Sequence, residues 1–436
     1  MNVSINKFRP SNIYFFLCFL GYLITPAIPS FRTGVFATLL LLAVALEIGN
    51  GVIKSENKSD FISLLNITVL LYFVYNIFSV IWIILNGYPI SLFVMEFSNS
   101  ILPIVFFFVP VYMKINDRWE NINQVYRAFL VAFLILSFVC IVLYITAPQW
   151  YCDYLFNMSY ISKADASTAR VRMEGVTGST CISFLGVAAM LVCARFMYAC
   201  FNADASTSEK RKIVISKQFI GYTALFVYSL AVVFLANGRA GMVVALLIIV
   251  YINFLVFLTF KFLDRKYLYI EIAAVVVIVI GMVIAVPGAA LKIWARLVSL
   301  PGAVGQRSEQ WVSAINNMPA QWWGQWFGNG LGANGHKAIG IEGAHVVPDG
   351  GLVKLYCEEG AIGFSLLVFI LLKTFKKGIK ELKNYFAELG IVAAVLLMSI
   401  GSNIIAFQLC VPIFYFAIGV VLAEKNTDGK LDGGDK

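Results

Sequence analysis

The chain has 436 residues, of which 60% are hydrophobic and only 13% are charged, with a net charge of +9. Together with a mean hydropathy of +0.83, this composition excludes an ordinary soluble domain. The positive charge does not indicate a nucleic-acid partner, because basic clusters beside membrane spans set the topology and contact anionic lipid headgroups.

The apolar residues form blocks of about 17 to 25 residues, the length that crosses a bilayer as a helix. Backbone groups in lipid must be paired within helices or a closed barrel, and continuous apolar runs without strict alternation favour helices. The sequence therefore predicts an all-α polytopic membrane protein with about twelve transmembrane helices. The predicted spans are 13–29, 34–51, 61–86, 91–113, 125–146, 176–200, 218–236, 240–260, 268–286, 351–372, 385–401 and 404–422.

The last two predicted spans form one apolar run. We divide it at Gly401, Ser402 and Asn403, because a single helix over the whole run would be too long for the membrane.

The orientation follows from Lys and Arg, which concentrate in cytoplasmic loops. With both termini inside, 23 of the 33 Lys and Arg residues lie on the cytoplasmic side and 10 on the outer side. The chain then divides into nine spans over 1–286, a large periplasmic loop with short helices over 287–350, and three spans with a short cytoplasmic tail over 351–436. The eight cysteines lie mostly inside spans and form no C-x-x-C pair, so they predict neither a disulfide framework nor a metal site.

The segment from Gly328 to Gly363 contains 10 of the chain's 33 glycines and both of its histidines. Glycine lets a chain turn tightly and pass close to a ligand or to another helix. The G-x-G-x-x-G pattern at 330–335 does not predict a dinucleotide site, because no strand precedes it and the segment faces away from the cytoplasm. We therefore expect the function to lie on the outer face.

One helix is predicted near the middle of the large loop, where Arg307, Trp311, Ile315 and Met318 are spaced to share a face. Arg307 near the start of this helix suits an anion at the membrane surface, and a snorkelling arginine is the alternative. The tryptophans in "QWWGQWFG" fit either an aromatic belt at the bilayer surface or stacking on sugar rings.

Three further arginines are placed at the outer surface. Arg239, in "NGRAG", lies between two spans with almost no loop, where an arginine is costly unless it meets an anion, a carboxylate or carbonyl groups. Arg170 and Arg172, in "ARVRMEGVTGS", precede the sixth span. With Arg307 they put four guanidinium groups on one face of the membrane. Because the planar fork of arginine binds phosphate, a pyrophosphate at headgroup level is the predicted ligand.

Asp349 precedes the span that begins near Gly351, where it can act as a helix cap or as a general base. His345, four residues upstream, is the other candidate base. Neutral histidine and ionised aspartate are both available near neutral pH, so the sequence leaves the two open. Lys354 and Glu358 are spaced i, i+4, and we expect them to pair within the span.

Three stretches in order, "NGRAGMVVALL", "RSEQWVSAINNMPAQWWGQWFGNGLG" and "LVKLYCEEGAIG", resemble a series shared by the bacterial O-antigen polymerase and O-antigen ligase superfamily. In that family a span starts with a Ser/Gly-Arg pair, and an Arg-x-x-x-Trp-x-x-Ala helix leads through Pro to G-x-G. A His-Asn pair then opens a span that ends in E-x-G-x-x-G. The resemblance covers residues 237–363 closely and the rest of the chain only by the number of spans.

The resemblance implies a GT-C-like glycosyltransferase that acts without a metal or cofactor on undecaprenyl-pyrophosphate-linked oligosaccharides, at the periplasmic side of the inner membrane. Arg239 and Arg307 match the arginines that grip the donor pyrophosphate. Asp349 stands where the ligases have histidine, which favours a polymerase that joins repeat units over a ligase that transfers polymer to lipid A core. Besides the lipid-linked substrate and membrane lipid, the implied partners are a chain-length regulator and a flippase of the same pathway.

A transporter or flippase of lipid-linked oligosaccharides is the alternative from another class. Glu47, Glu96, Asn99, Arg195 and Glu271 fall within predicted spans, where a transporter places its site. Transporters are commonly built from two repeated halves with a site at the midplane. The sequence shows no such repeat and gathers its polar residues in one outer loop, so it favours an enzyme.

Overall fold

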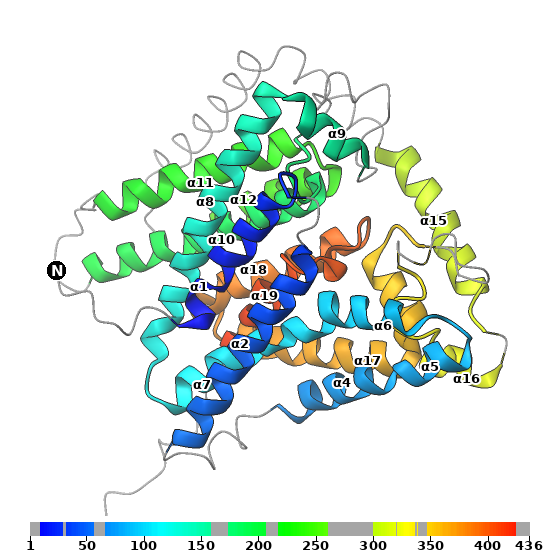
Figure 1. Ribbon diagram of the computed structural model, residues 1–436. Helices are drawn as coiled ribbons and strands as arrows, with labels where there is room; N and C mark the ends of the chain where they lie inside the picture. Colours follow the sequence, from blue (N-terminus) through cyan, green and yellow to red (C-terminus); the bar gives the residue numbers. More distant parts are fainter. Residues whose placement is uncertain are drawn as a thin grey trace, which may run out of the picture.

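The chain folds as a bundle of helices (Figure 1). The computed structural model describes residues 9–28, 32–55, 66–157, 173–205, 217–259, 300–319, 321–335, 338 and 347–423. Every regular element in those residues is helical, which confirms the all-α class for the described part. The α-helices are α1 (Pro10–Ile24), α2 (Thr33–Lys54), α4 (Ile67–Phe78), α5 (Val80–Leu85), α6 (Ile90–Glu96), α7 (Val105–Ile115), α8 (Ile122–Thr146), α9 (Gln149–Asn157), α10 (Ser179–Ala205), α11 (Lys217–Ala236), α12 (Arg239–Thr259), α15 (Leu300–Asn316), α16 (Trp322–Phe327), α17 (Gly351–Lys380), α18 (Leu382–Ser399) and α19 (Val411–Ala423).

Within the described residues, eight helical segments are long and apolar enough to cross a membrane, and three shorter apolar helices accompany them. The chain is therefore built as a multi-pass membrane protein. The ninth predicted span, 268–286, lies outside the described residues, so the count of about twelve spans stays a prediction. The eight segments are Thr33–Lys54, Ile67–Leu85, Ile90–Ile115, Trp119–Thr146, Ser179–Cys200, Lys217–Ala236, Gly351–Lys380 and Leu382–Ser399, and the shorter helices are Pro10–Ile24, Arg239–Leu255 and Val411–Ala423.

Two breaks in the helices matter for the site. The predicted division of the last apolar run is confirmed, because α18 ends at Ser399 and α19 begins only at Val411. The connecting segment, residues 400–410, contains one short 3₁₀ turn. The second break is inside α17, where Gly360 has φ 65° and ψ −172°. Only glycine adopts such angles readily, so the helix changes direction there.

Successive helices run in alternating directions, so the helix ends that are predicted to lie outside the membrane are at one end of the bundle. We call it the outer end. There the N–H of Gly351, at the start of α17, donates to the carbonyl of Ser402 (3.0 Å). The N–H of Met173 likewise donates to Leu235, near the end of α11 (3.0 Å). In Figure 1, α15 and α16 lie beyond the start of α17, at the right-hand side of the bundle.

The opposite end, the inner end, has its own polar contacts. Arg195 Nη1 lies 2.5 Å from Glu388 Oε1, which links α10 to α18. Lys373 Nζ donates to Thr68 Oγ1 (2.8 Å), which links α17 to α4. These ends are the ones that the charge distribution predicts to be cytoplasmic.

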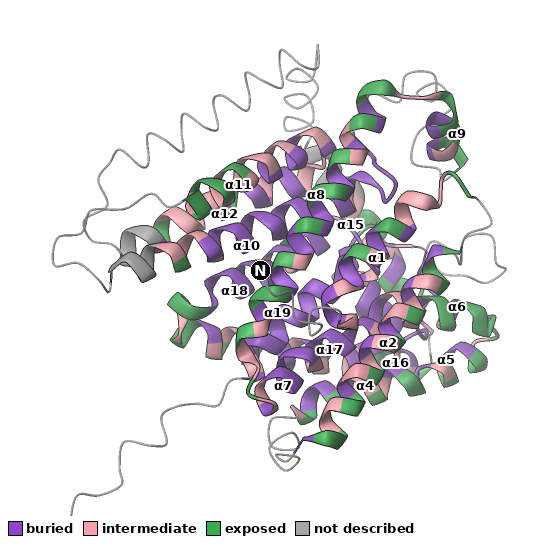
Figure 2. Cartoon of the chain, turned by 60° about the vertical axis from the view of Figure 1, so that its left-hand side comes forward, coloured by how far each residue is buried: buried purple, intermediate pink, exposed green. Residues whose placement is uncertain are grey.

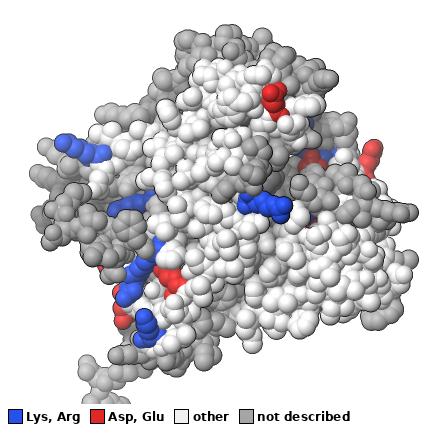
Figure 3. Space-filling view, viewed as in Figure 1, with Lys and Arg blue, Asp and Glu red and all other residues white. Residues whose placement is uncertain are grey.

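Burial separates the central helices from the peripheral ones (Figure 2). In the apolar stretch of α10, 83% of the residues are buried inside the protein, whereas in that of α2 only 22% are. Leu46 and Ile53 on α2 are 68% and 69% exposed, as expected of side chains that face lipid. The described surface in Figure 3 is mostly uncharged, with Lys, Arg, Asp and Glu in a few separate places.

Candidate functional site

The outer end carries an ion pair between residues that are 42 positions apart in the chain. Arg307 Nε on α15 donates to Asp349 Oδ2, just before α17, at 2.9 Å. The side chains are 26% and 50% exposed, respectively. The pair is thus accessible from outside the bundle, and we call it the outer pair.

Close backbone approach holds α15 against the start of α17. Trp311, one turn after Arg307, donates from Nε1 to the carbonyl oxygen of Asp349 (3.2 Å). A Cβ atom at Gly350 would lie only 2.6 Å from that Nε1, so a larger residue there would push α15 away. At Gly401 an added Cβ would lie 2.7 Å from Arg307 Nη1, the end of a flexible side chain, so a larger residue there would displace the guanidinium group and not the helix. Packing therefore requires the glycine at position 350, and the glycine at 401 leaves room for the guanidinium.

The segment between α18 and α19 also contacts the place where α15 meets the start of α17. Asn403 Nδ2 donates to the carbonyl of Pro348 (3.2 Å), and Ser402 accepts from Gly351. The backbone on both sides of Asp349 is therefore fixed, and its carboxylate is held where α15 meets α17.

The outer pair retains the capacity to bind an anion. Among the described residues, Arg307 donates a side-chain hydrogen bond only from Nε, so neither η nitrogen has an acceptor in that part of the chain. A guanidinium group presents these nitrogens as a planar fork that fits two oxygens of a phosphate. Asp349 keeps the guanidinium plane in one orientation, and its own exposed carboxylate can accept a proton.

The structure excludes one of the two roles that the sequence leaves open for Asp349. It is not the helix cap, because the N-cap residue of α17 is Gly350 and no side chain caps the helix. The carboxylate turns to Arg307, and a charge-assisted bond of this kind outweighs an exposed cap.

Two expectations for the helix that carries Arg307 are wrong. The helix α15 begins at Leu300, so Arg307 lies in its middle and not near its start. Ile315 is 42% exposed, while Ala314 and Met318 are buried. The buried stripe therefore runs through Ala314 in place of Ile315.

Arg239 lies at the same end of the bundle, as the first residue of α12. A two-residue turn precedes it, in which Asn237 has φ 51°. The first turn of α12 packs tightly on α10, since a Cβ at Gly241 would lie 2.5 Å from the Cβ of Ser183. The same added Cβ at Gly241 would lie 3.7 Å from Met398 on α18, and Met398 is three residues before Gly401.

The structure thus brings Arg307 and Asp349 into contact and places Arg239 at the same end of the bundle. The other sequence-predicted site residues, Arg170, Arg172 and His345, lie outside the described residues.

A second ionic site, which the sequence predicts only in part, is buried inside the bundle. Lys354 on α17 pairs with Glu358 (3.5 Å), as the i, i+4 spacing predicts. It also pairs with Glu96 at the end of α6, 258 positions away, which sequence reasoning missed. Ser100 donates to the same Glu96 carboxylate (2.5 Å). We call Lys354, Glu96 and Glu358 the buried triad.

A glycine-rich loop, residues 328–335, closes over the buried triad. The N–H of Asn334 donates to Glu358 Oε1 (3.0 Å), and the N–H of Gly330 donates to the carbonyl of Glu358 (3.0 Å). Gly332 has φ 90°, and a Cβ there would lie 2.5 Å from the carbonyl oxygen of Leu92 on α6. The sequence left open whether these glycines approach a ligand or a helix. At Gly330 and Gly332 the close neighbours belong to α5 and α6.

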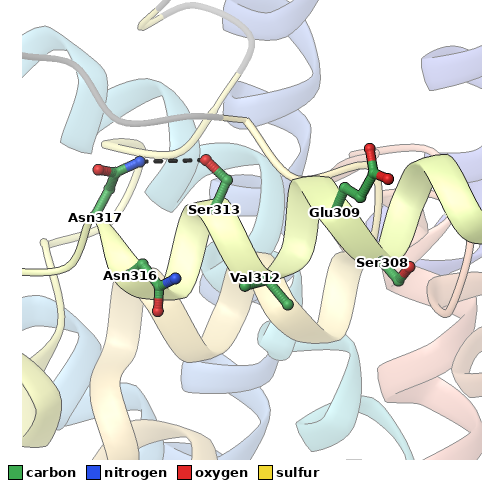
Figure 4. A pocket seen from close by; sticks show the side chains of 6 residues that line it. All are labelled: Ser308, Glu309, Val312, Ser313, Asn316 and Asn317. Carbon is green, nitrogen blue, oxygen red and sulfur yellow. Dashed lines mark hydrogen bonds between the residues drawn. The ribbon is translucent and has the colours of Figure 1, made fainter.

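A shallow hollow of about 520 Å³ lies on the other side of α15 (Figure 4). At 100° per residue, its lining positions fall on the side of α15 opposite Arg307 and Trp311. None of the described residues that line it is an arginine, so they do not supply the fork that a pyrophosphate needs. Ser308, Glu309, Val312, Ser313, Asn316 and Asn317 line it.

No group of three or more His, Cys, Asp or Glu side chains that could hold a metal ion occurs in the described part of the chain. Comparison with known protein families finds no match, and comparison with curated proteins finds none. The outer pair, with Arg239 at the same end of the bundle, is therefore the candidate site on its own geometry.

Proposed function

We propose that the protein is an O-antigen polymerase, an inverting glycosyltransferase with a GT-C-like fold. In this proposal it joins undecaprenyl-pyrophosphate-linked oligosaccharide repeat units at the periplasmic face of the bacterial inner membrane, and it needs no metal. The observation that carries the proposal is the outer pair, in which an arginine with available η nitrogens is held by an exposed carboxylate 2.9 Å away. The order and spacing of the motifs over residues 237–363 supply the substrate class.

The residues suit each step of such a transfer. The bond between the anomeric carbon and the pyrophosphate of the donor breaks, and the lipid pyrophosphate leaves with the electron pair. Arg307 and Arg239 stabilise the negative charge that develops on this leaving group, a task that metal ions perform in other enzymes. Arg170 and Arg172 are further candidates for the same task.

A hydroxyl group of the acceptor saccharide forms the new bond to the anomeric carbon and must lose its proton. Asp349 and His345 are the candidate bases. Asp349 also has a second role. By accepting the hydrogen bond from Arg307, it orients the guanidinium group of Arg307 towards the leaving group. A carboxylate that accepts only one strong hydrogen bond keeps further lone pairs to receive the proton.

Deletion of the gene, followed by gel analysis of the surface polysaccharide, tests the reaction. We expect lipid A core to carry at most one repeat unit, because repeat units are no longer joined. Loss of even the single capped unit, with lipid-linked polymer accumulating, would instead identify a ligase. Purified protein should convert defined lipid-linked repeat units into polymer without added metal, and no polymer under any condition would overturn the proposal.

The orientation has its own test. A reporter active only in the periplasm, inserted after Gly340, should be active, and the same reporter after Lys377 should be silent. The reverse pattern would put the outer pair in the cytoplasm, away from the lipid-linked repeat units.

Transport is the alternative function, and the contacts of the described intramembrane charges argue against it; Glu271 lies outside the described residues. Arg195 pairs with Glu388, and Glu96 pairs with Lys354. Glu47 accepts from the N–H of Ser11 (2.8 Å). Each of these charged groups joins two helices of the bundle, which is a structural task. Movement of labelled lipid-linked oligosaccharide across proteoliposomes, at a rate independent of polymerisation, would favour a flippase.

A further inference from the structure

Two cysteines from distant parts of the chain meet at the outer end. Cys181 is the third residue of α10, and Cys410 directly precedes α19. Their sulfur atoms lie 3.2 Å apart, although 229 positions separate the residues in the chain. Both side chains are almost fully buried, at 1% and 0% exposure.

The two sulfur atoms lie only slightly farther apart than in a disulfide bond. A disulfide requires about 2.05 Å between its sulfur atoms, so the thiols need to approach by roughly one further ångström. This is the one pair of thiols in mutual contact among the described cysteines.

The position of the pair decides its redox environment. Both thiols lie at helix ends that face outward in the proposed orientation, and the bacterial periplasm maintains disulfides. We propose that Cys181 and Cys410 form a disulfide bond in the mature protein. The proposal rests on the proposed orientation, and it does not depend on which reaction the outer pair catalyses.

The bond forms by exchange with a protein disulfide oxidant of the periplasm. The thiolate of one cysteine attacks the oxidant disulfide and displaces one of its sulfur atoms, giving a mixed disulfide. The thiolate of the second cysteine then attacks the mixed disulfide, so that the oxidant leaves as a dithiol. Two protons and two electrons pass from the cysteines to the oxidant. Because both thiols are buried in the folded protein, the exchange takes place before α10 and residues 400–410 close together.

The disulfide would strengthen the support beneath the outer pair. Residues 400–410 contain Gly401 against Arg307, and Ser402 as the acceptor for Gly351. A covalent link from Cys410 to α10 fixes the far end of this segment. The segment that positions Asp349 is then tied to α10, whose apolar stretch has 83% of its residues buried.

Differential alkylation tests the proposal. Cells are quenched in acid, and the denatured protein is labelled with N-ethylmaleimide, then reduced and labelled again with an isotopically distinct maleimide. We expect the second label on Cys181 and Cys410, and the first label on Cys193 and Cys357, which are equally buried. First label on both Cys181 and Cys410 would overturn the proposal, and so would a disulfide from either residue to Cys18 or Cys140.

Two variants give the matched control. Cys181→Ser should move Cys410 to the first label, whereas Cys193→Ser should leave the Cys181 and Cys410 labels unchanged. The test of the disulfide and the test of the proposed function can fail independently. A disulfide in a protein that forms no polymer would refute the reaction alone, and a reduced pair in an active polymerase would refute the disulfide alone.

Discussion

The outer pair and the buried triad both involve the first part of α17, yet their surroundings differ. In the triad, Lys354 is 4% exposed and Glu358 is fully buried, whereas Asp349 of the outer pair is 50% exposed. Ions that have lost their water depend wholly on each other, because their desolvation is costly unless the partners stay in place. The outer pair keeps water at one side and can exchange it for a ligand. We therefore propose a structural role for the triad and the chemical role for the outer pair.

The loop over the triad strengthens this contrast. The N–H of Asn334, in residues 328–335, donates to Glu358 Oε1, and Asn329 Nδ2 donates to Asn334 Oδ1 (2.9 Å). The loop and the triad are thus joined by hydrogen bonds within the described residues. A group with this many internal bonds holds the loop on α17 and has little freedom to bind substrate.

The largest effect is expected from Lys354→Met, which leaves two buried carboxylates without their cation. Breaking a buried pair from one side costs about 3 to 5 kcal/mol. We expect little folded protein, measured as the monodisperse fraction after extraction in detergent.

The matched control is the neutral triad, made by Glu96→Gln, Lys354→Met and Glu358→Gln together. It removes all three charges and keeps an oxygen that accepts from Asn334, so folded protein should largely return. Equal loss in the single and triple variants would mean that the shape of Lys354, and not uncompensated charge, is what the bundle requires.

Arg307→Lys should break the outer pair's chemistry while the fold persists. A lysine keeps the charge but cannot present two parallel donors, and loss of such a contact in the transition state lowers turnover roughly 100-fold. Arg239→Lys should behave similarly. The measurement is polymer formed per folded protein from defined lipid-linked repeat units.

Glu309→Gln, on the hollow side of α15, is the control with matched position and should leave turnover unchanged. Full-length polymer from both lysine variants would favour a snorkelling or purely electrostatic role for the arginines.

Gly332→Ala should destabilise the loop over the triad. At φ 90° alanine is strained, and its Cβ would meet backbone on α6 at 2.5 Å. We expect a loss of about 1 to 3 kcal/mol, seen as a lower midpoint of thermal unfolding in detergent. Gly49→Ala on α2 has no atom within 4 Å of the added Cβ and should be neutral. If the two variants unfold alike, the loop is not fixed on the bundle as described.

The smallest effect is expected from Asp349→Asn. Asparagine keeps an oxygen that accepts from Arg307 Nε, but the hydrogen bond loses its charge assistance. If orienting Arg307 is the main role of Asp349, turnover should fall about 10-fold in the Asn variant and about 100-fold in Asp349→Ala, with KM rising in both.

Equal inactivity of the Asn and Ala variants, with KM unchanged, would identify Asp349 as the base. His345→Ala completes the comparison, since a base at that position should lose turnover while lipid-linked substrate still binds.

The sequence by itself determined the features that depend on neighbouring residues. The apolar blocks predict the helices of a membrane protein, because length and composition alone decide whether a segment is stable in lipid. The break at Gly401, Ser402 and Asn403 and the pairing of Lys354 with Glu358 follow from the same local rules.

Only the tertiary structure decided which distant side chains meet. Glu96 reaches Lys354 across 258 positions, and Arg307 reaches Asp349 across 42. Asp349 illustrates the reason, because the local pattern allows a cap, whereas the packing of α15 supplies Arg307 as its partner. Helical periodicity fixes which residues share a face, but the packing of whole helices selects the face that is buried and the ions that lose their water.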